Sequence, residues 1–153
     1  MRTLPLADLP ALTGAELGVS GWVVVDQAMI DAFAVLTRDR QWIHVDVDRA
    51  GREADGTIAH GFLVLSLIGG MTGEIAVFAG ARMGLNYGFD RIRFLTPVRA
   101  GSSVRLRESV VSVEARGDGV LLRRECRIEL QGHSSDGGRP AVIADWLTLF
   151  YPA

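Results

Sequence analysis

The chain of 153 residues contains no lysine, because all 16 of its basic residues are arginine. Without lysine it cannot form a Schiff base with a carbonyl substrate, and a phosphate-binding P-loop is excluded as well. Its single cysteine, Cys126, cannot form an internal disulfide, which is usual for proteins of a reducing cytosol. We therefore expect a cytoplasmic protein.

A strong excess of charge is also missing. The net charge of −2 gives no indication of a surface for nucleic acid or for an anionic membrane, so we expect neither partner. The first residues, 1–6, lack the long apolar segment of a secretory signal peptide. The length and the 48% share of hydrophobic residues predict a single globular domain, residues 1–153, with its own core.

The segment 57–73 carries no formal charge and organises the rest of the chain. Apolar residues fill almost every position from Phe62 to Ile68, so a helix here is apolar on all sides and must be enclosed. A membrane-spanning helix needs about 20 apolar residues, and this run is interrupted by His60, Ser66 and several glycines. We predict a buried central helix that fades near residues 78–80 and is wrapped by a sheet.

The remaining segments alternate between short helices and longer strands. Asp26 and Asp46 are predicted helix N-caps. The pattern predicts helices at 6–12, 28–36 and 47–54, strands at 19–25, 83–87, 90–95, 104–114, 120–130 and 142–151, and loops at 37–43 and 131–139. This order indicates an α+β fold with one antiparallel sheet wrapped around one long central helix.

The predicted last strand, 142–151, is apolar on both of its faces. One face covers the central helix. The other would be an unusual apolar surface if it were exposed on a soluble monomer. We therefore expect a homodimer in which a second copy covers this face.

Asp39 and His44 form a candidate acid/base pair, because the loop between them can turn back and bring them together. Histidine titrates near neutral pH, and a carboxylate can orient it. By itself the spacing fits an ordinary polar loop equally well. Gly61 begins the central helix, where free backbone N–H groups can stabilise an oxyanion; it also fits a glycine needed only for close packing.

Other polar residues give weaker signals. A metal site built from His44, Asp46 and His60 has no spaced ligand motif behind it, so we expect no metal and take His60 as a capping or packed histidine. His133 lies in a polar loop and is expected to be solvated. Cys126 lies on an apolar strand face and is expected in the core.

Two segments in this order, FAVLTRDRQWIHVD at 33–46 and IAHGFL at 58–63, resemble the MaoC-like dehydratases. That family includes the (R)-specific enoyl-CoA hydratases and a nodulation protein N-like branch, which NYGFDRIRF at 86–94 also resembles. The resemblance extends over about 21–151. It implies the hot-dog fold, an antiparallel sheet around one long helix, in a protein that is usually a homodimer.

The resemblance also implies roles for individual residues. The catalytic aspartate and histidine correspond to Asp39 and His44, the oxyanion-hole glycine to Gly61, and a helix serine that contacts the aspartate to Ser66. Ser66 is equally able to bond to a carbonyl one turn back in its helix. The chain departs from the family at Arg38, where glycine is common, and at Arg40; we expect both arginines to point outward.

The implied activity is the hydration of a trans-2-enoyl thioester to an (R)-3-hydroxyacyl thioester. Coenzyme A is then part of the substrate, acyl carrier protein is an alternative carrier, and no further cofactor is expected. A non-catalytic acyl-thioester-binding protein and a hot-dog thioesterase are alternatives. Candidates for an acyl-tail pocket, each of which also fits the core, are Trp42, Phe62, Leu63 and Met83.

Overall fold

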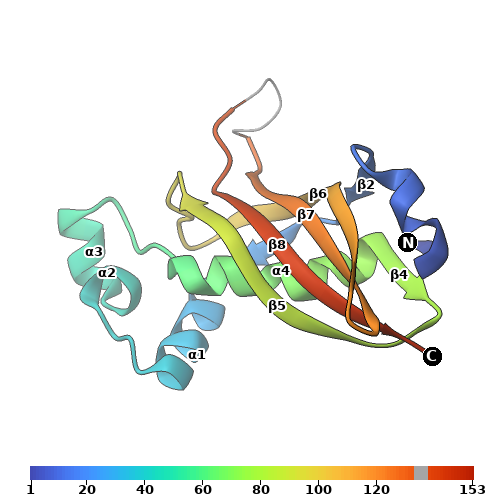
Figure 1. Ribbon diagram of the computed structural model, residues 1–153. Helices are drawn as coiled ribbons and strands as arrows, with labels where there is room; N and C mark the ends of the chain where they lie inside the picture. The colour runs from blue at the N-terminus through green and yellow to red at the C-terminus, as the bar shows by residue number, and fades with distance from the viewer. Residues whose placement is uncertain (133–137) are drawn as a thin grey trace.

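The computed structural model describes residues 1–132 and 138–153, and helix α4, Gly61–Ile75, runs through its centre. The sheet curls around this helix, as Figure 1 shows. The buried side chains of α4 are Leu63, Val64, Ile68, Met71, Thr72 and Ile75. The enclosed central helix that its uniformly apolar sequence predicts is therefore confirmed.

The sheet has six antiparallel strands. They are β2 (Glu16–Val19), β3 (Val23–Val25), β5 (Ala81–Phe94), β6 (Ser102–Arg116), β7 (Gly119–Leu130) and β8 (Val142–Pro152). Their order is β2-β6-β7-β8-β5, and β3 pairs with β6 beside β2. The predicted α+β class, with a sheet wrapped around one long helix, is confirmed.

Three helices gather at the N-terminal end of α4, whereas both chain termini lie at the other end (Figure 1). The three are α1 (Gln27–Thr37), α2 (Trp42–Val45) and α3 (Val47–Glu53), and a 3₁₀ helix, η1 (Leu6–Leu12), precedes them in sequence. Both predicted N-caps are confirmed. The Asp26 carboxylate accepts from the Met29 N–H at 2.8 Å, and that of Asp46 from the Arg49 N–H at 3.0 Å.

Several predicted boundaries were wrong. The central helix ends at Ile75, and the chain continues as strand β4 (Ala76–Ala79), which pairs in parallel with β1 (Arg2–Pro5). This pairing joins distant segments, so no local pattern announces it. The predicted strand 19–25 breaks into β2 and β3, the strands 83–87 and 90–95 are one bulged strand, and the predicted loop 37–43 includes the start of α2.

The predicted loop 131–139 lies largely in residues 133–137, outside the described residues, and so does His133. Among the described helices, none combines the length and the continuous apolar sequence needed to cross a bilayer.

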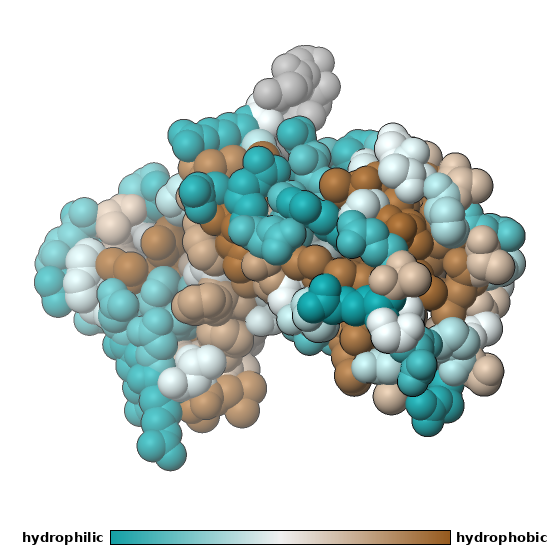
Figure 2. Space-filling view, in the orientation of Figure 1, coloured by the Kyte–Doolittle hydropathy of each residue, from teal (hydrophilic) through white to brown (hydrophobic). Residues whose placement is uncertain are grey.

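The outer face of β8 does not need a partner to cover it, so this argument for a dimer was wrong. Leu147 and Leu149 are only 9% and 8% exposed in the single chain, where they pack with Leu121 and Tyr151. Exposed apolar side chains lie instead on β5, an edge strand of the sheet: Met83, Leu85, Tyr87 and Phe94. In Figure 2, apolar patches appear on the face that carries β5 and β8 in Figure 1.

A buried ion pair lies on the inner face of the sheet, beside the C-terminal half of α4. Arg124 donates to the Glu108 carboxylate at 3.0 Å, and both side chains are almost completely buried. The same carboxylate accepts from the Thr72 hydroxyl of α4 at 2.8 Å. Nearby Cys126 is in the core, as predicted, and burial together with the charge of Glu108 raises the pKa of its thiol.

Candidate active site

Asp39 is placed by the end of helix α1. The helix stops at Thr37, and Arg38 follows in the left-handed conformation, with φ of 63°. This conformation suits glycine and strains most other residues. The glycine that is common at this position in the resembled family would therefore adopt it more easily than Arg38 does. The reversal at Arg38 turns the chain so that Asp39 approaches the start of α4. Arg38 and Arg40 are both exposed, as expected.

His44 lies on the short helix α2 and is buried. Its Nδ1 is 2.7 Å from the carbonyl oxygen of Ile58. A carbonyl only accepts hydrogen bonds, so Nδ1 carries a proton, and in the neutral imidazole Nε2 is then the acceptor. The Gln27 side chain holds the same region, because its amide donates to the His44 carbonyl at 2.8 Å and its oxygen accepts from the Thr57 hydroxyl at 2.5 Å.

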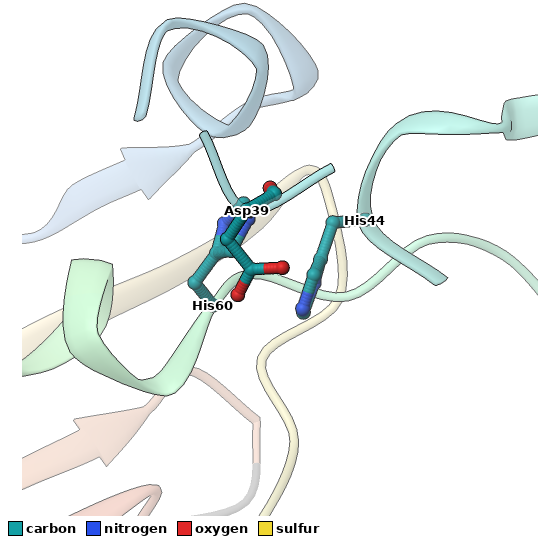
Figure 3. A group of neighbouring side chains, drawn as sticks. All are labelled: Asp39, His44 and His60. Atoms are coloured by element: carbon teal, nitrogen blue, oxygen red, sulfur yellow. Dashed lines mark hydrogen bonds between the residues drawn. The ribbon is translucent and has the colours of Figure 1, made fainter. Parts of the chain in front are cut away.

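Asp39 and His44 come together with a third residue, His60. One polar side-chain atom from each of the three lies within 4.8 Å of the others. Figure 3 shows the Asp39 carboxylate directed towards His44, with His60 alongside. The two imidazole rings are stacked, with centroids 3.8 Å apart and planes at 25°. A carboxylate beside a histidine with a free Nε2 is suited to general acid/base chemistry.

A cavity of about 380 Å³ opens beside this group. His44 and Gly61 both line it, and the remaining wall is mostly apolar, formed by Val64, Phe94, Leu95, Pro97, Val98 and Val142 among others. Gly61 is the first residue of α4, so its N–H has no acceptor inside the helix. A side chain at Gly61 would lie 3.0 Å from the ring of Phe94 and narrow the cavity. The cavity thus has on its wall His44, which lies next to Asp39, and the first residue of α4.

The three side chains include two imidazoles and a carboxylate, so they are also the residues that could hold a metal ion. Two histidines bind one metal when their lone pairs converge on it. Here the ring planes are stacked and nearly parallel, so the lone pairs do not converge. Asp46, the other carboxylate considered, caps α3.

The chain matches the family model of the MaoC like domain over residues 8–125. It belongs to the MaoC-like family. Nodulation protein N of Rhizobium leguminosarum bv. viciae is 44% identical over 153 residues, which cover 97% of this chain and 92% of that relative. 3-Hydroxyacyl-thioester dehydratase Z of Mycobacterium tuberculosis is 38% identical over 153 residues, which cover 98% and 99%.

Solved structures show the same fold as this MaoC-like chain. The unliganded R-hydratase PhaJ1 of Pseudomonas aeruginosa superposes with a TM-score of 0.75 at 21% identity, over 98% of this chain and 87% of that one. The (R)-hydratase of A. caviae, involved in PHA biosynthesis, gives a TM-score of 0.69 at 26% identity, over 89% and 94%. The hot-dog fold is thereby confirmed.

Further predicted site residues of this MaoC-like protein lie away from the cavity wall. The Ser66 hydroxyl donates to the carbonyl of Phe62 at 2.7 Å, which is the local bond left open as the alternative to an aspartate contact. Trp42 packs beneath the guanidinium of Arg49. Phe62 is 69% exposed and meets the edge of Phe94, which does line the cavity.

Leu63 is buried in the core, and Met83 is partly exposed on β5. A role for these residues in substrate binding stays a prediction. The sequence analysis missed the place of His60 in the central group and the bridging role of Gln27. The position of His60 directly before Gly61 was the available signal for its place in this group. The spacing of Gln27 from His44 and Thr57 gives no signal of the bridge that Gln27 forms.

Proposed function

We propose that this MaoC-like protein hydrates a trans-2-enoyl thioester to an (R)-3-hydroxyacyl thioester and catalyses the reverse dehydration. The observation that carries the proposal is that His44 and Gly61 line one cavity and that the Asp39 carboxylate lies next to His44. Two relatives add support, because one is named a 3-hydroxyacyl-thioester dehydratase and one solved neighbour an (R)-hydratase.

In the proposed mechanism, Asp39 and His44 hold one water molecule between them. In neutral His44 the Nδ1–H donates to the Ile58 carbonyl, which fixes the tautomer and leaves Nε2 to accept a proton from the water. The water oxygen forms a bond to C3 while the electron pair of the C2=C3 bond moves towards the thioester oxygen. The proton held by the pair then passes to C2 on the same face, and both side chains return to their starting states.

Gly61 acts on the charge that develops during the reaction. Negative charge accumulates on the thioester oxygen when C3 is attacked. The free N–H at the start of α4 and the positive end of the helix dipole stabilise it there. The apolar wall of the cavity strengthens this interaction because it excludes water.

The reaction needs no cofactor beyond the carrier of the acyl group. Coenzyme A is the proposed carrier, with acyl carrier protein as the alternative. Arg38 and Arg40 are exposed beside Asp39 and available to meet the phosphates of such a carrier.

A homodimer is proposed as well, with the apolar edge strand β5 as the surface that a second copy covers.

The test is an assay with crotonyl-CoA that follows loss of the conjugated thioester by ultraviolet absorbance and release of free thiol with a thiol reagent. Hydration consumes the conjugation and releases no thiol. A thioesterase releases thiol, and a binding protein gives affinity without turnover. Replacing His44→Ala should abolish hydration and leave the thermal unfolding transition in place. Near-normal turnover in that variant would refute the assignment.

A further inference from the structure

His60 occupies a position that packing alone does not explain. It is the N-cap residue of α4, yet its side chain makes no capping hydrogen bond. The ring is buried with 3% exposure, and its Nδ1 has no hydrogen-bond partner within the described residues. An apolar ring of similar size would fill this space without burying an unpartnered nitrogen, so histidine here calls for another reason.

The ring of His60 contacts both members of the proposed catalytic pair. Its Nε2 lies 2.9 Å from the main-chain oxygen of Asp39, so Nε2 carries the proton and donates to that carbonyl. Its flat face stacks on the ring of His44 at 3.8 Å. On another side it meets Phe33, with centroids 5.1 Å apart, which holds it from α1.

We propose that His60 is a positioning residue that sets the distance and angle between Asp39 and His44. This inference rests on the proposed hydratase function. The hydrogen bond fixes the main chain that carries the carboxylate, and the stacked ring fixes the plane in which His44 presents Nε2 to the cavity. Histidine supplies a flat ring and an N–H donor together, whereas phenylalanine supplies only the ring and glutamine only the donor.

Three variants of His60 measure how much its bond to Asp39 and its stacking on His44 each contribute to kcat. His60→Leu removes both contacts and should lower kcat by about 100-fold with KM little changed, because a small misplacement of catalytic groups has an effect of that size. His60→Gln keeps a donor for Asp39, and His60→Phe keeps the stacking on His44. Each should recover part of the lost kcat.

Ile75→Val is the matched control for lost stability alone. Ile75 is buried at the other end of α4. This variant should unfold at a lower temperature with kcat unchanged. If all three His60 variants keep the wild-type kcat, the positioning role is refuted, even if their unfolding temperatures fall.

Nitrogen NMR of the imidazoles tests the same proposal without turnover. The chain has three histidines, so single variants assign every ring signal. At about pH 8, where free imidazoles are neutral, His44 should be protonated at Nδ1 and His60 at Nε2. In His60→Leu the His44 signals should shift towards those of a mobile, exchanging ring. Unchanged His44 signals would overturn the proposal.

The two measurements separate this inference from the hydratase proposal. A wild type that hydrates no enoyl thioester, together with His44 signals that shift in His60→Leu, refutes the hydratase and supports the positioning. An active wild type with a fully active His60→Leu variant refutes the positioning alone.

Discussion

Polar groups are buried at both ends of α4, but their hydrogen-bond partners differ between the two ends. At the C-terminal end, the Arg124 guanidinium pairs with Glu108 and donates to the Thr148 hydroxyl at 2.7 Å. Glu108 also accepts from Thr72. The charges at this end largely compensate each other inside the chain.

At the N-terminal end, the polar groups are held by the main chain and not by each other. His44 and His60 each donate from one ring nitrogen to a backbone carbonyl, so the other nitrogen of each ring is not engaged by that bond. Within the described residues the Asp39 carboxylate makes no hydrogen bond or ion pair, and it lies beside His44 and His60 (Figure 3). The paired charges of Arg124 and Glu108 neutralise each other within the fold. The unpaired carboxylate of Asp39 and the oriented ring of His44 are instead available for chemistry.

The largest expected effects on stability and on activity come from replacing one carboxylate by an amide at each end of α4, Glu108→Gln and Asp39→Asn. Glu108→Gln leaves Arg124 as a buried charge without its counterion and should lower the free energy of unfolding by about 3 to 5 kcal/mol. Asp39→Asn should leave that free energy almost unchanged and abolish hydration. Urea unfolding and the crotonyl-CoA assay, run on both variants, measure the contrast. Equal losses of stability would show that the two ends do not differ as described.

Gly61 offers a second test, at the N-terminal end of α4. Proline is well accommodated at the first position of a helix, and His60 before it already has the extended conformation that proline requires, with ψ of 136°. Gly61→Pro should therefore preserve the helix, remove the N–H and lower kcat by about 100- to 1,000-fold.

Gly61→Ala is the matched control, because it adds the same Cβ near Phe94 and keeps the N–H. The ring of Phe94 is half exposed and can move aside, so this variant should lose much less activity. If the alanine and proline variants lose activity equally, the effect is steric and the N–H has no role.

Much of this architecture could be predicted from the sequence. The enclosed helix followed from a charge-free apolar segment, and the N-caps from Asp26 and Asp46. Asp39, His44 and Gly61 were selected from loop chemistry and from the family resemblance. These features depend on short sequence patterns whose physical meaning is local.

What the sequence analysis missed depends on contacts between distant segments. The sequence analysis placed Cys126 on an apolar strand face, but Arg124 lies between Leu122 and Cys126 on the same inner face, and only the fold shows Glu108 within its reach. The β1–β4 pairing is of the same kind. His60 was taken as a capping or packed histidine. Its ring is packed but caps nothing, and its stacking on His44 requires two chain segments to meet.

Backbone strain at Arg38, near the N-terminal end of α4, should give a smaller effect. Arg38→Gly should raise the free energy of unfolding by up to about 1 kcal/mol, because glycine adopts the left-handed conformation without steric penalty. Thermal unfolding of the variant measures the gain. A lower unfolding temperature would mean that the arginine side chain stabilises this turn by contacts of its own.

The smallest expected effect on stability comes from Glu129, which pairs with Arg105 and Arg107 on the outer face of the sheet. It gives a scale for the effect of the buried Arg124–Glu108 pair. Burial by itself would raise the pKa of Glu129, but hydrogen bonds from Arg107 and Arg105 bring this pKa below its ordinary value. A lowered pKa in the folded state stabilises the fold above the unfolded pKa, and this stability is lost as the pH falls through the folded value.

Glu129→Gln should therefore lower stability at neutral pH by less than about 1 kcal/mol. The difference from wild type should shrink as the pH falls below about 4, the ordinary pKa of glutamate, and close below the lowered pKa of folded Glu129. Urea unfolding across this pH range measures it. A difference that stays constant down to low pH would show that ionisation of Glu129 does not contribute.

The position of a bound thioester tests the central claim most directly. A crystal structure of the His44→Ala variant with crotonyl-CoA should place the thioester oxygen about 3 Å from the Gly61 nitrogen, with C3 facing Asp39. A thioester bound instead in the groove beside Arg124 and Trp146, at the opposite end of α4, would contradict the account.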